Sequence, residues 1–393
     1  MENLFNYNWE LCKVKDFLIE SKIKGSNGKI AKKLTVKLWR KGIVAKEEVY
    51  EGSLATQYYV RKSGQFMYGK LDFLNQAFGI VPIELDGYES TVDSPSFDFK
   101  PLVDSVFFLE YVSLEKFYKY QGNIANGSRK AKRIHVETFF NMPLPTPSYK
   151  EQQKIGTLFK QLDDTITLHQ RKLDQLKELK KAYLQVMFPA KDERAPKLRF
   201  ADFEGEWEQC KLGNILTERN TQQSKSKEYP LVSFTVEDGV TPKTERYERE
   251  QLVRGDKSSK KYKVTELNDI VYNPANLKFG AIARNHYGKA VFSPIYITFI
   301  VNDKLACSSY VEVFITRKDF ISYSLKYQQG TVYERQSVSP ENLLNMKFLL
   351  PNTKEQEFIG HFFEKLDCNS NFHKKKITQL KNLKKSYLQN MFI

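Results

Sequence analysis

Two long stretches of the chain place apolar residues at alternating intervals of three and four, which is the pattern of a helix with one apolar face. They occupy residues 151–188 and residues 355–392. The spacing of about 3.5 residues predicts a coiled-coil seam along each helix. The seam positions are Ile155, Phe159, Leu162, Ile166, Leu173, Leu176, Tyr183 and Met187 in the first stretch, and Ile359, Phe363, Leu366, Ile377, Leu380, Tyr387 and Met391 in the second.

Each helix is expected to begin at a capping residue that follows a proline. Ser148 and Asn352 stand three positions before a glutamate, which is the arrangement of an N-terminal cap. Gly156 and Gly360 recur at the same place in the two helices, although glycine costs about 1 kcal/mol relative to alanine inside a helix. Their repetition predicts that another backbone approaches each helix closely.

The two stretches are copies of one another, because 20 of their 38 aligned positions are identical. The duplication extends further, since the Trp-Glu pair at Trp9 recurs at Trp207. A weaker echo relates residues 75–79 to residues 276–280. A repeat of about half the chain predicts two modules of one fold, each a globular segment followed by a long helix.

Segments 1–146 and 207–350 have the composition of mixed α/β domains. Residues 103–112 and 290–301 are rich in β-branched and aromatic residues and are expected to form strands. Residues 189–206 carry two prolines among many charges, which predicts a linker. The expected order is therefore a domain at 1–146, a helix at 147–188, a linker at 189–206, a domain at 207–350 and a helix at 351–393.

The simplest way to bury both seams is to pair the two helices antiparallel within one molecule. The expected fold class is then α+β, with two pseudo-two-fold-related mixed α/β domains separated by two long antiparallel coiled-coil helices. Homodimerisation through the coiled coil is the alternative.

The net charge of +15 favours a polyanionic partner. Residues 22–46 hold nine lysines and arginines and no acid, with Trp39 among them, and further basic clusters lie at 128–133 and 257–263. Since basic clusters recur in both modules, nucleic acid is the favoured partner, and a solvated basic surface is the alternative.

No apolar run approaches the roughly 20 residues of a membrane span, and the N-terminal residues resemble no targeting peptide. The expected location is cytoplasmic. The four cysteines form no CxxC pair and are expected to be buried reduced thiols.

No catalytic constellation or metal-binding motif can be found in the sequence. It has neither a phosphate-binding loop nor an HExxH motif, and its five histidines lack ligand spacing. Residues 272–276 partly match the motif with which amino-methyltransferases hold a flipped base, but they lack its second proline and stacking aromatic residue. An autonomous methyltransferase therefore remains only as an alternative hypothesis.

Residues 195–208, the Leu-Pro and Glu-Gln pairs at 144–152 and 350–356, and the duplicated layout together resemble the specificity subunit of type I restriction-modification systems. The resemblance covers essentially the whole chain. One departure is the first module, which lacks the Pro-x-Leu-Arg-Phe approach found before Trp207.

The resemblance implies that each globular segment is a target recognition domain that reads one half of a split double-stranded DNA sequence. It implies that the helices space these domains and dock two modification subunits that methylate adenine. S-adenosylmethionine, ATP and Mg are expected on the modification and restriction subunits, and no cofactor is expected on this chain, which would itself be non-catalytic.

Within these domains, basic side chains are candidates for phosphate contacts, and polar side chains of the echoed glycine-containing loops are candidates for base reading. The phosphate candidates are Lys29, Lys32, Lys33, Arg129, Lys130, Lys132, Arg133, Lys257, Lys260 and Lys261. The base-reading candidates are Lys70, Asn75, Gln76, Asn276, Lys278, Arg284 and Arg335. Asn75 and Asn276 could instead simply cap turns.

The sequence thus predicts a non-catalytic reader of DNA sequence. A coiled-coil adaptor that binds only protein partners is the alternative from another class. Steep salt dependence of binding to duplex DNA would favour the first hypothesis.

Overall fold

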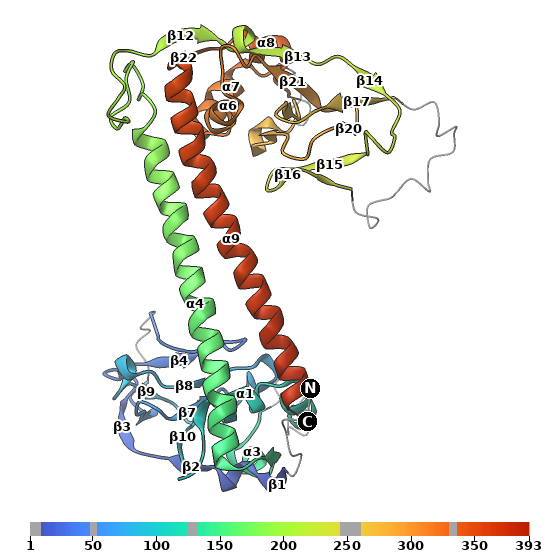
Figure 1. Cartoon of the computed structure of the whole chain (residues 1–393). Helices are drawn as coiled ribbons and strands as arrows, with labels where there is room; N and C mark the ends of the chain where they lie inside the picture. Colours follow the sequence, from blue (N-terminus) through green and yellow to red (C-terminus); the bar gives the residue numbers. More distant parts are fainter. Residues whose placement is uncertain (1–8, 48–52, 124–132, 244–260, 330–335, 393) are drawn as a thin grey trace. The chain divides into compact units, whose positions relative to one another are not determined.

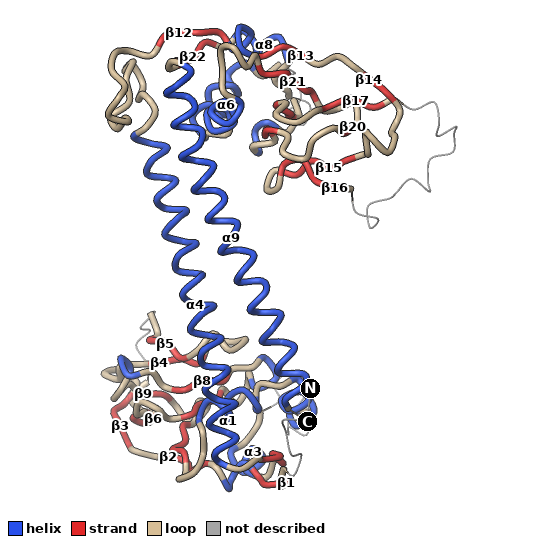
Figure 2. The backbone as a smooth tube through the Cα atoms, viewed as in Figure 1, coloured by secondary structure: helices blue, strands red, loops and turns tan. Residues whose placement is uncertain are grey.

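The computed structural model describes residues 9–47, 53–123, 133–243, 261–329 and 336–392 (Figure 1). The chain divides into two compact units. Unit 1 consists of residues 1–170 and 375–393, and unit 2 consists of residues 171–374. Figure 2 shows that strands and short helices make up the globular part of each unit, while two long helices run through the chain.

The globular part of unit 1 is a set of small antiparallel sheets, with the strand orders β1-β11, β2-β10-β7-β8, β3-β6-β9 and β4-β5. The strands are β1 Glu10–Lys13, β2 Leu18–Ser21, β3 Lys24–Asn27, β4 Leu34–Val36, β5 Ile43–Ala45, β6 Gln57–Val60, β7 Phe66–Tyr68, β8 Phe78–Ile80, β9 Glu89–Ser90, β10 Ser96–Phe99 and β11 Pro143–Thr146. The short helices are η1 Val14–Asp16, η2 Phe73–Asn75, η3 Ile83–Leu85, α1 Ser105–Val112, α2 Glu115–Gly122 and α3 Val136–Phe140.

Unit 2 repeats this plan sheet by sheet, with the strand orders β12-β22, β13-β21-β18-β19, β14-β17-β20 and β15-β16. The strands are β12 Glu208–Lys211, β13 Leu216–Glu218, β14 Gln222–Gln223, β15 Val232–Thr235, β16 Gly239–Pro242, β17 Tyr262–Thr265, β18 Ile270–Tyr272, β19 Ile282–Arg284, β20 Ala290–Phe292, β21 Ile297–Val301 and β22 Lys347–Leu350. The short helices are α5 Leu212–Ile215, η6 Leu277–Phe279, α6 Ser308–Ile315, α7 Lys318–Ser324, η7 Leu325–Tyr327 and α8 Pro340–Asn345. The duplication seen in the sequence is therefore a duplication of fold.

The two predicted long helices are confirmed as α4, Tyr149–Val186, and α9, Thr353–Met391. Both caps also form, since Ser148 Oγ accepts from the backbone N–H of Glu151 at 3.4 Å and Asn352 Oδ1 from that of Glu355 at 2.9 Å. No seam position is exposed, and the seam is buried at half of its positions in unit 1 and at most of them in unit 2. The predicted mixed α+β fold class with two long helices is confirmed.

The helices pair antiparallel inside each unit. In unit 1 the beginning of α4 meets the end of α9, where Lys384 Nζ lies 2.7 Å from a carboxylate oxygen of Asp163. In unit 2 the end of α4 meets the beginning of α9, where Lys180 Nζ lies 2.6 Å from Asp367. The two ion pairs occupy equivalent positions of the repeat, as the antiparallel arrangement requires.

Gly156 and Gly360 mark the places where a short helix packs against each long helix, although the predicted close approach of a backbone atom occurs only at Gly360, beside Tyr310 N. A Cβ at Gly156 would collide with the side chain of Asp104, and one at Gly360 would collide with Ser309. Because only glycine leaves this space, α1 can dock on α4 in unit 1, and α6 can dock on α9 in unit 2.

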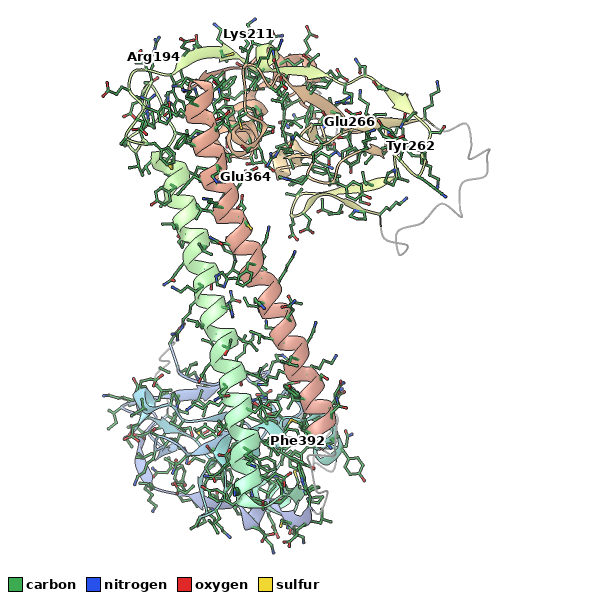
Figure 3. All side chains as sticks on the ribbon, viewed as in Figure 1. Arg194, Lys211, Tyr262, Glu266, Glu364 and Phe392 are labelled. Atoms are coloured by element: carbon green, nitrogen blue, oxygen red, sulfur yellow. The ribbon has the colours of Figure 1, made fainter. Side chains whose placement is uncertain are left out.

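A phenylalanine near the end of each long helix completes the aromatic core of a unit. The ring of Phe392 lies 5.7 Å from those of Phe107 and Phe159 in unit 1, and Trp9 packs beside it (Figure 3). Phe188 follows α4 and occupies the same position in unit 2, packed against Trp207, Tyr310 and Phe363. Each unit thus needs both long helices to fill its core.

The predicted strand at residues 103–112 is wrong, because this segment forms helix α1. Asp104 caps the helix by accepting a 2.8 Å hydrogen bond from the backbone N–H of Phe107. Its aromatic residues then bury one helical face, with Phe107, Phe108 and Tyr111 at most 5% exposed. Packing of that face outweighs the β propensity of the residues. The second predicted strand segment, 290–301, does contain β20 and β21.

Residues 189–206, the expected linker, belong to unit 2 and contact the beginning of α9. Arg199 donates to both carboxylate oxygens of Glu355, at 2.6 and 2.7 Å, and that carboxylate is fully buried. Phe200 packs against Phe358 of α9. None of the four cysteines is buried, because Cys368 is exposed and the other three are half-buried, so the expectation of buried thiols is wrong.

Candidate nucleic-acid interface

In each unit, a buried tyrosine fixes the base of the loop that holds the base-reading candidates, called here the candidate loop. The hydroxyl of Tyr68 donates to the carbonyl of Ile134 at 3.0 Å, and that of Tyr272 donates to the carbonyl of Val338 at 3.2 Å. Each tyrosine ends a central strand, β7 or β18, directly before the loop. The burial of both phenols raises their pKa values, so they act as neutral structural donors.

The two candidate loops occupy equivalent places in the two units. Their structural alignment differs by three residues from the alignment that the sequence echo of 75–79 with 276–280 suggested. In unit 1, the backbone N–H of Ala77 donates to the carbonyl of Asp72, and in unit 2 that of Ala281 donates to Asn276. The structure therefore pairs Asn276 with Asp72, not with Asn75. The echo of residues 75–79 with 276–280 was misleading, because Phe78 lies buried in strand β8.

In unit 1, Asn75 and Gln76 form the end of this loop and are both half-buried. Gln76 adopts a left-handed backbone with φ of 51°. The amide of Asn75 lies 3.4 Å from Asp72 Oδ1, which is the turn-stabilising contact weighed as its alternative role. The carbonyls of both residues accept from the turn between β4 and β5, because Trp39 N donates to Asn75 O at 2.8 Å and Arg40 N to Gln76 O at 3.0 Å.

The β4–β5 turn is anchored from inside by an ion-pair chain. Arg40 donates to both carboxylate oxygens of Glu110, at 2.6 and 2.7 Å. Glu110 also accepts from Lys384 at 3.0 Å, and Lys384 in turn bonds Asp163. Since Glu110 is only 1% exposed, these charges stabilise each other at low dielectric, and the chain ties the turn to both long helices.

The remaining described candidates of unit 1 differ in their exposure. Lys29, Lys32 and Arg133 are exposed, and Arg133 forms a 3.4 Å ion pair with Asp93. Lys33 is 7% exposed, with its ammonium 5.6 Å from the ring centre of Tyr58, and it therefore has a structural position. Lys70 is half-buried, and burial lowers its pKa despite the nearby carboxylate of Asp93.

In unit 2, a groove of about 850 Å³ runs along the equivalent loop. It lies between the β15–β16 turn, the η6 loop, α6, and the parts of α4 and α9 that belong to this unit. Its walls carry both signs of charge, including those of Lys278, Lys318, Glu237 and Asp238. The acidic groups distinguish this surface from the acid-free segment 22–46 of unit 1.

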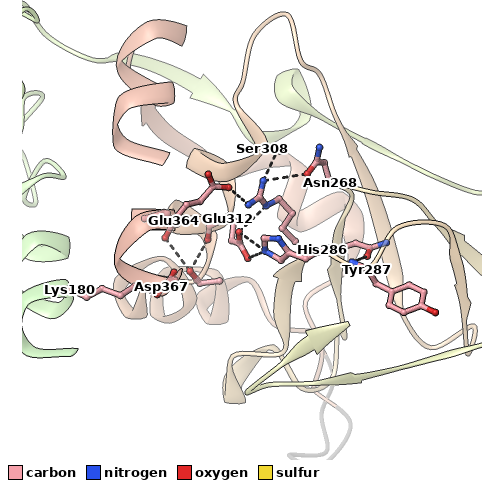
Figure 4. A network of polar contacts seen from close by, with 12 residues as sticks. Lys180, Asn268, His286, Tyr287, Ser308, Glu312, Glu364 and Asp367 are labelled. Atoms are coloured by element: carbon pink, nitrogen blue, oxygen red, sulfur yellow. Dashed lines mark hydrogen bonds and ion pairs between the residues drawn. The ribbon is translucent and has the colours of Figure 1, made fainter. Parts of the chain in front are cut away.

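Arg284 lines that groove. Figure 4 shows the network of polar contacts around its partner Glu312. Its guanidinium is paired with Glu312 at 2.9 Å and with Glu364 of α9. His286 Nε2 lies 3.0 and 3.1 Å from the two carboxylate oxygens of Glu312. Burial alone would raise the pKa of Glu312, but His286 and Arg284 outweigh it and hold the pKa below its usual value. With Arg284 only 7% exposed, this network gives it a structural position.

The other base-reading candidates of unit 2 lie on the η6 loop. Asn276 is exposed, and Lys278 is half-buried with its ammonium 5.2 Å from the ring centre of Phe279. Phe279 is 65% exposed and was not singled out by sequence reasoning. Lys261 is exposed. The predicted residues Arg129, Lys130, Lys132, Lys257, Lys260 and Arg335 lie outside the described residues.

Sequence reasoning also missed the anchoring role of Arg40, Glu110 and Lys384. No local signal joins them, because they are 70 or more positions apart. Trp39 lies in the basic segment 22–46, and the sequence predicted no role for it, although its side chain is largely exposed in the structure.

Within the described parts of the chain, no group of histidine, cysteine and carboxylate side chains could hold a metal ion. No helix there has the length and apolarity needed to cross a lipid bilayer.

Comparison with known proteins finds one matching family model and several solved structures of similar fold. Residues 97–178 match the family described as "Type I restriction modification DNA specificity domain". No curated protein sequence matches the chain.

Among solved structures, the S subunit of a type I restriction-modification system from M. genitalium has the same fold, with a TM-score of 0.64 at 13% identity. That alignment covers 100% of this chain and 98% of the other. The HsdS subunit from Thermoanaerobacter tengcongensis aligns over 100% of this chain and 98% of its own at 13% identity, with a TM-score of 0.46. The family match at residues 97–178 and the fold shared with the M. genitalium subunit both agree with the resemblance to type I specificity subunits that the sequence indicated.

Proposed function

We propose that this chain is the DNA sequence-specificity subunit of a type I restriction-modification complex. Each globular module reads one half of a bipartite double-stranded target. The paired helices set the spacing between the half-sites and dock two modification subunits. The chain itself is non-catalytic in this proposal.

One observation supports this proposal above the others. The two units share their sheets, their tyrosine anchors and their helix ion pairs, whereas the loops and turns on that scaffold differ in sequence and charge. A duplicated scaffold with two different sets of loops suits a molecule that binds two half-sites of different sequence through the same mode of docking. The net charge of +15 favours DNA as the common ligand.

The chemistry of methylation and cleavage would belong to the partners. S-adenosylmethionine would bind to the modification subunits, which methylate adenine. ATP and Mg would bind to restriction subunits that join the complex. On this chain the described residues would contribute phosphate contacts, through side chains such as Lys29 and Lys32, and base contacts, through the loops at residues 73–77 and 276–280.

A module exchange tests the proposal directly. Residues 1–146 are replaced by the corresponding module of another specificity subunit, and the chain is expressed with its modification subunits. Methylated adenines are then mapped across the host genome. We expect one half of the methylated motif to change while the other half is kept. If both halves stayed the same, or if methylation ignored the chain's identity, the proposal would be wrong.

Salt dependence separates this function from that of a protein-only adaptor. A chain that contacts several phosphates should lose about 10³-fold or more in affinity for its duplex between 50 and 200 mM salt. An adaptor would bind its protein partners and show no specific duplex binding at either salt concentration.

A further inference from the structure

The turn between β4 and β5 presents a large aromatic side chain to solvent. Trp39 is 57% exposed and its neighbour Leu38 is 38% exposed. By contrast, Trp207 is 2% exposed in the core of unit 2. Tryptophan is among the most buried residue types on average, so an indole held out at the tip of a turn requires an explanation.

The backbone of this turn is strained. Trp39 has a φ of 58° and Arg40 a φ of 54°, so two consecutive residues with side chains adopt the left-handed conformation. Such conformations persist only where surrounding contacts hold them, and they concentrate at functional sites. Glycine or asparagine would occupy these positions at lower cost.

The contacts that hold the turn also determine which way its side chains point. Arg40 reaches inward to the buried carboxylate of Glu110 with two hydrogen bonds. The backbone N–H groups of Trp39 and Arg40 bind the carbonyls of Asn75 and Gln76. Arg40 is thus anchored inside and the backbone of the turn is bonded to the predicted base-reading loop, while the indole remains largely exposed.

The surroundings of the indole indicate the chemistry of its ligand. Lys37 and Lys41 flank it and are both exposed, and residues 22–46 contain no acid. The nearest described carboxylate of the anchor, Glu110, is already neutralised by Arg40 and Lys384. A ligand that satisfies this surface must offer both negative charge and a flat apolar face. Nucleic acid offers both, as phosphates beside stacked bases.

We propose that Trp39 stacks on a nucleobase at an opened step of the half-site read by unit 1, while Lys37 and Lys41 contact the flanking phosphates. This inference rests on the proposed function and adds the residue that makes the apolar contact. Apolar side chains that enter a base step kink the duplex, and their cost depends on how easily that step unstacks. Trp39 would thereby favour half-sites with a flexible step at that position.

A single aromatic side chain surrounded by lysines is less suited to a protein partner. Protein interfaces of lasting affinity bury broad apolar areas with few charges at their centre. Docking of a modification subunit on this turn is therefore treated as an alternative outcome of the test.

The test uses the full chain and a fluorescently labelled duplex that carries the motif found by methylation mapping. Affinity is measured for the wild type, Trp39→Ala, Trp39→Gly and Trp39→Phe at several salt concentrations. We expect Trp39→Ala and Trp39→Gly to bind about tenfold more weakly, within the range for one base–aromatic stack, and Trp39→Phe to retain most of the affinity. The glycine variant keeps the left-handed backbone, so its loss would report the indole and not a misfolded turn.

Three controls make the result specific. Ile83→Ala removes an apolar side chain of the same unit that is 81% exposed, and it should bind like the wild type. Lys41→Ala should reduce the slope of log affinity against log salt by about one, whereas the Trp39 variants should leave that slope unchanged. Indole emission should be quenched on binding of DNA to the wild type, and Trp39→Phe should abolish that part of the quenching.

The results of this experiment distinguish a failure of the stacking proposal from a failure of the proposed DNA-specificity function. Wild-type affinity for the duplex in both Trp39→Ala and Trp39→Gly would overturn the stacking proposal and leave the proposed function standing. Variants that bind the duplex normally but no longer co-purify with modification subunits would assign the turn to a protein interface and also overturn it. A wild-type chain, alone and with its modification subunits, that does not distinguish the motif from a scrambled duplex would overturn both.

Discussion

The two units have nearly the same interior and quite different surfaces. Inside, the phenylalanine pair Phe188 and Phe392, the tyrosines Tyr68 and Tyr272, and the lysine–aspartate pairs of the helices occupy equivalent places. Outside, the β4–β5 turn of unit 1 is Leu-Trp-Arg-Lys-Gly, whereas the β15–β16 turn of unit 2 is Val-Glu-Asp-Gly. The contrast shows that the repeated part forms the packed interior of each unit, whereas the turns on its surface differ in sequence and charge.

Close to the candidate loops, each unit presents an exposed aromatic side chain from a different segment. In unit 1 it is Trp39 of the hairpin turn, and in unit 2 it is Phe279 of the η6 loop, 65% exposed. Gly280 supplies the left-handed residue after η6, with a φ of 83°, where unit 1 has Gln76. Similar scaffolds can therefore offer an aromatic face from alternative positions.

The largest effect on the shared interior is expected from the phenylalanines. Phe392→Ala and Phe188→Ala each remove a ring that is at most 3% exposed, and each should destabilise its own unit by about 3–5 kcal/mol. Hydrogen exchange of the whole chain would show where protection is lost. Loss in unit 1 for Phe392→Ala and in unit 2 for Phe188→Ala is expected. Equal loss of hydrogen-exchange protection in both units for either variant would contradict the conclusion that the two units have separate cores.

The lysine–aspartate pairs should differ in strength although they are equivalent in position. Lys384 is 14% exposed and contacts Glu110 as well as Asp163, whereas Lys180 is 35% exposed and its partner Asp367 is 48% exposed. Lys384→Met should cost about 2–3 kcal/mol, because it weakens the pairing of a buried carboxylate. Lys180→Met should cost less than about 1 kcal/mol. Urea denaturation measures the free energy of unfolding of the two variants. Equal losses of stability would show that burial does not determine the strength of these ion pairs.

The acid sensitivity of unit 1 should depend on Glu110. Burial alone would raise the pKa of this carboxyl, but hydrogen bonds and charges from Arg40 and Lys384 outweigh it, and the pKa lies below its usual value. A folded-state pKa below the unfolded one gives stability that is complete above about pH 4.3 and is lost as the pH falls through the folded value.

The stability gap between the wild type and Glu110→Gln should accordingly narrow as the pH falls from 7 towards 3. The urea midpoint at each pH is the measurement. Glu84→Gln changes an exposed glutamate of the same unit and should show no such narrowing. A gap for Glu110→Gln that stayed constant with pH would argue against the buried ion-pair chain.

The smallest expected effect concerns the two tryptophans that begin the modules. Trp9 Nε1 donates to Glu151 at 3.3 Å, whereas Trp207 Nε1 is buried and has no hydrogen-bond partner among the described residues. In unit 2 the equivalent carboxylate, Glu355, is instead held by Arg199. Trp9→Phe should therefore lose about 1 kcal/mol more hydrogen-bond energy than Trp207→Phe. Thermal melts of the two variants measure this difference. A larger loss of stability in Trp207→Phe than in Trp9→Phe would contradict the prediction.

The long helices and the duplication could be predicted because their signals are periodic and local. The cap at Ser148, the glycine at Gly156 and the seam each follow from spacing within one segment. Helix α1 was missed because its aromatic residues have β propensity, and only their packing on α4 decides the outcome.

The candidate surface was predicted less well, for a related reason. Lys33 and Arg284 count as basic residues in the sequence, but folding buries both side chains, and Arg284 lies between two carboxylates. The pairing of Arg40 with Glu110 and Lys384 depends on contacts across large separations, which no spacing rule supplies. Charge composition indicated the kind of ligand, whereas the three-dimensional fold determines which charges can reach it.

The position of Phe392 in the core of unit 1 has a consequence for synthesis. Unit 1 takes residues 375–393 from beyond the whole of unit 2, which occupies residues 171–374. At the usual rates of translation, the first module would wait roughly 10–40 s for its last aromatic ring. During that interval Trp9, Phe107 and Phe159 would lack their common neighbour. The nascent first half should accordingly depend on chaperones until α9 emerges from the ribosome and closes the core.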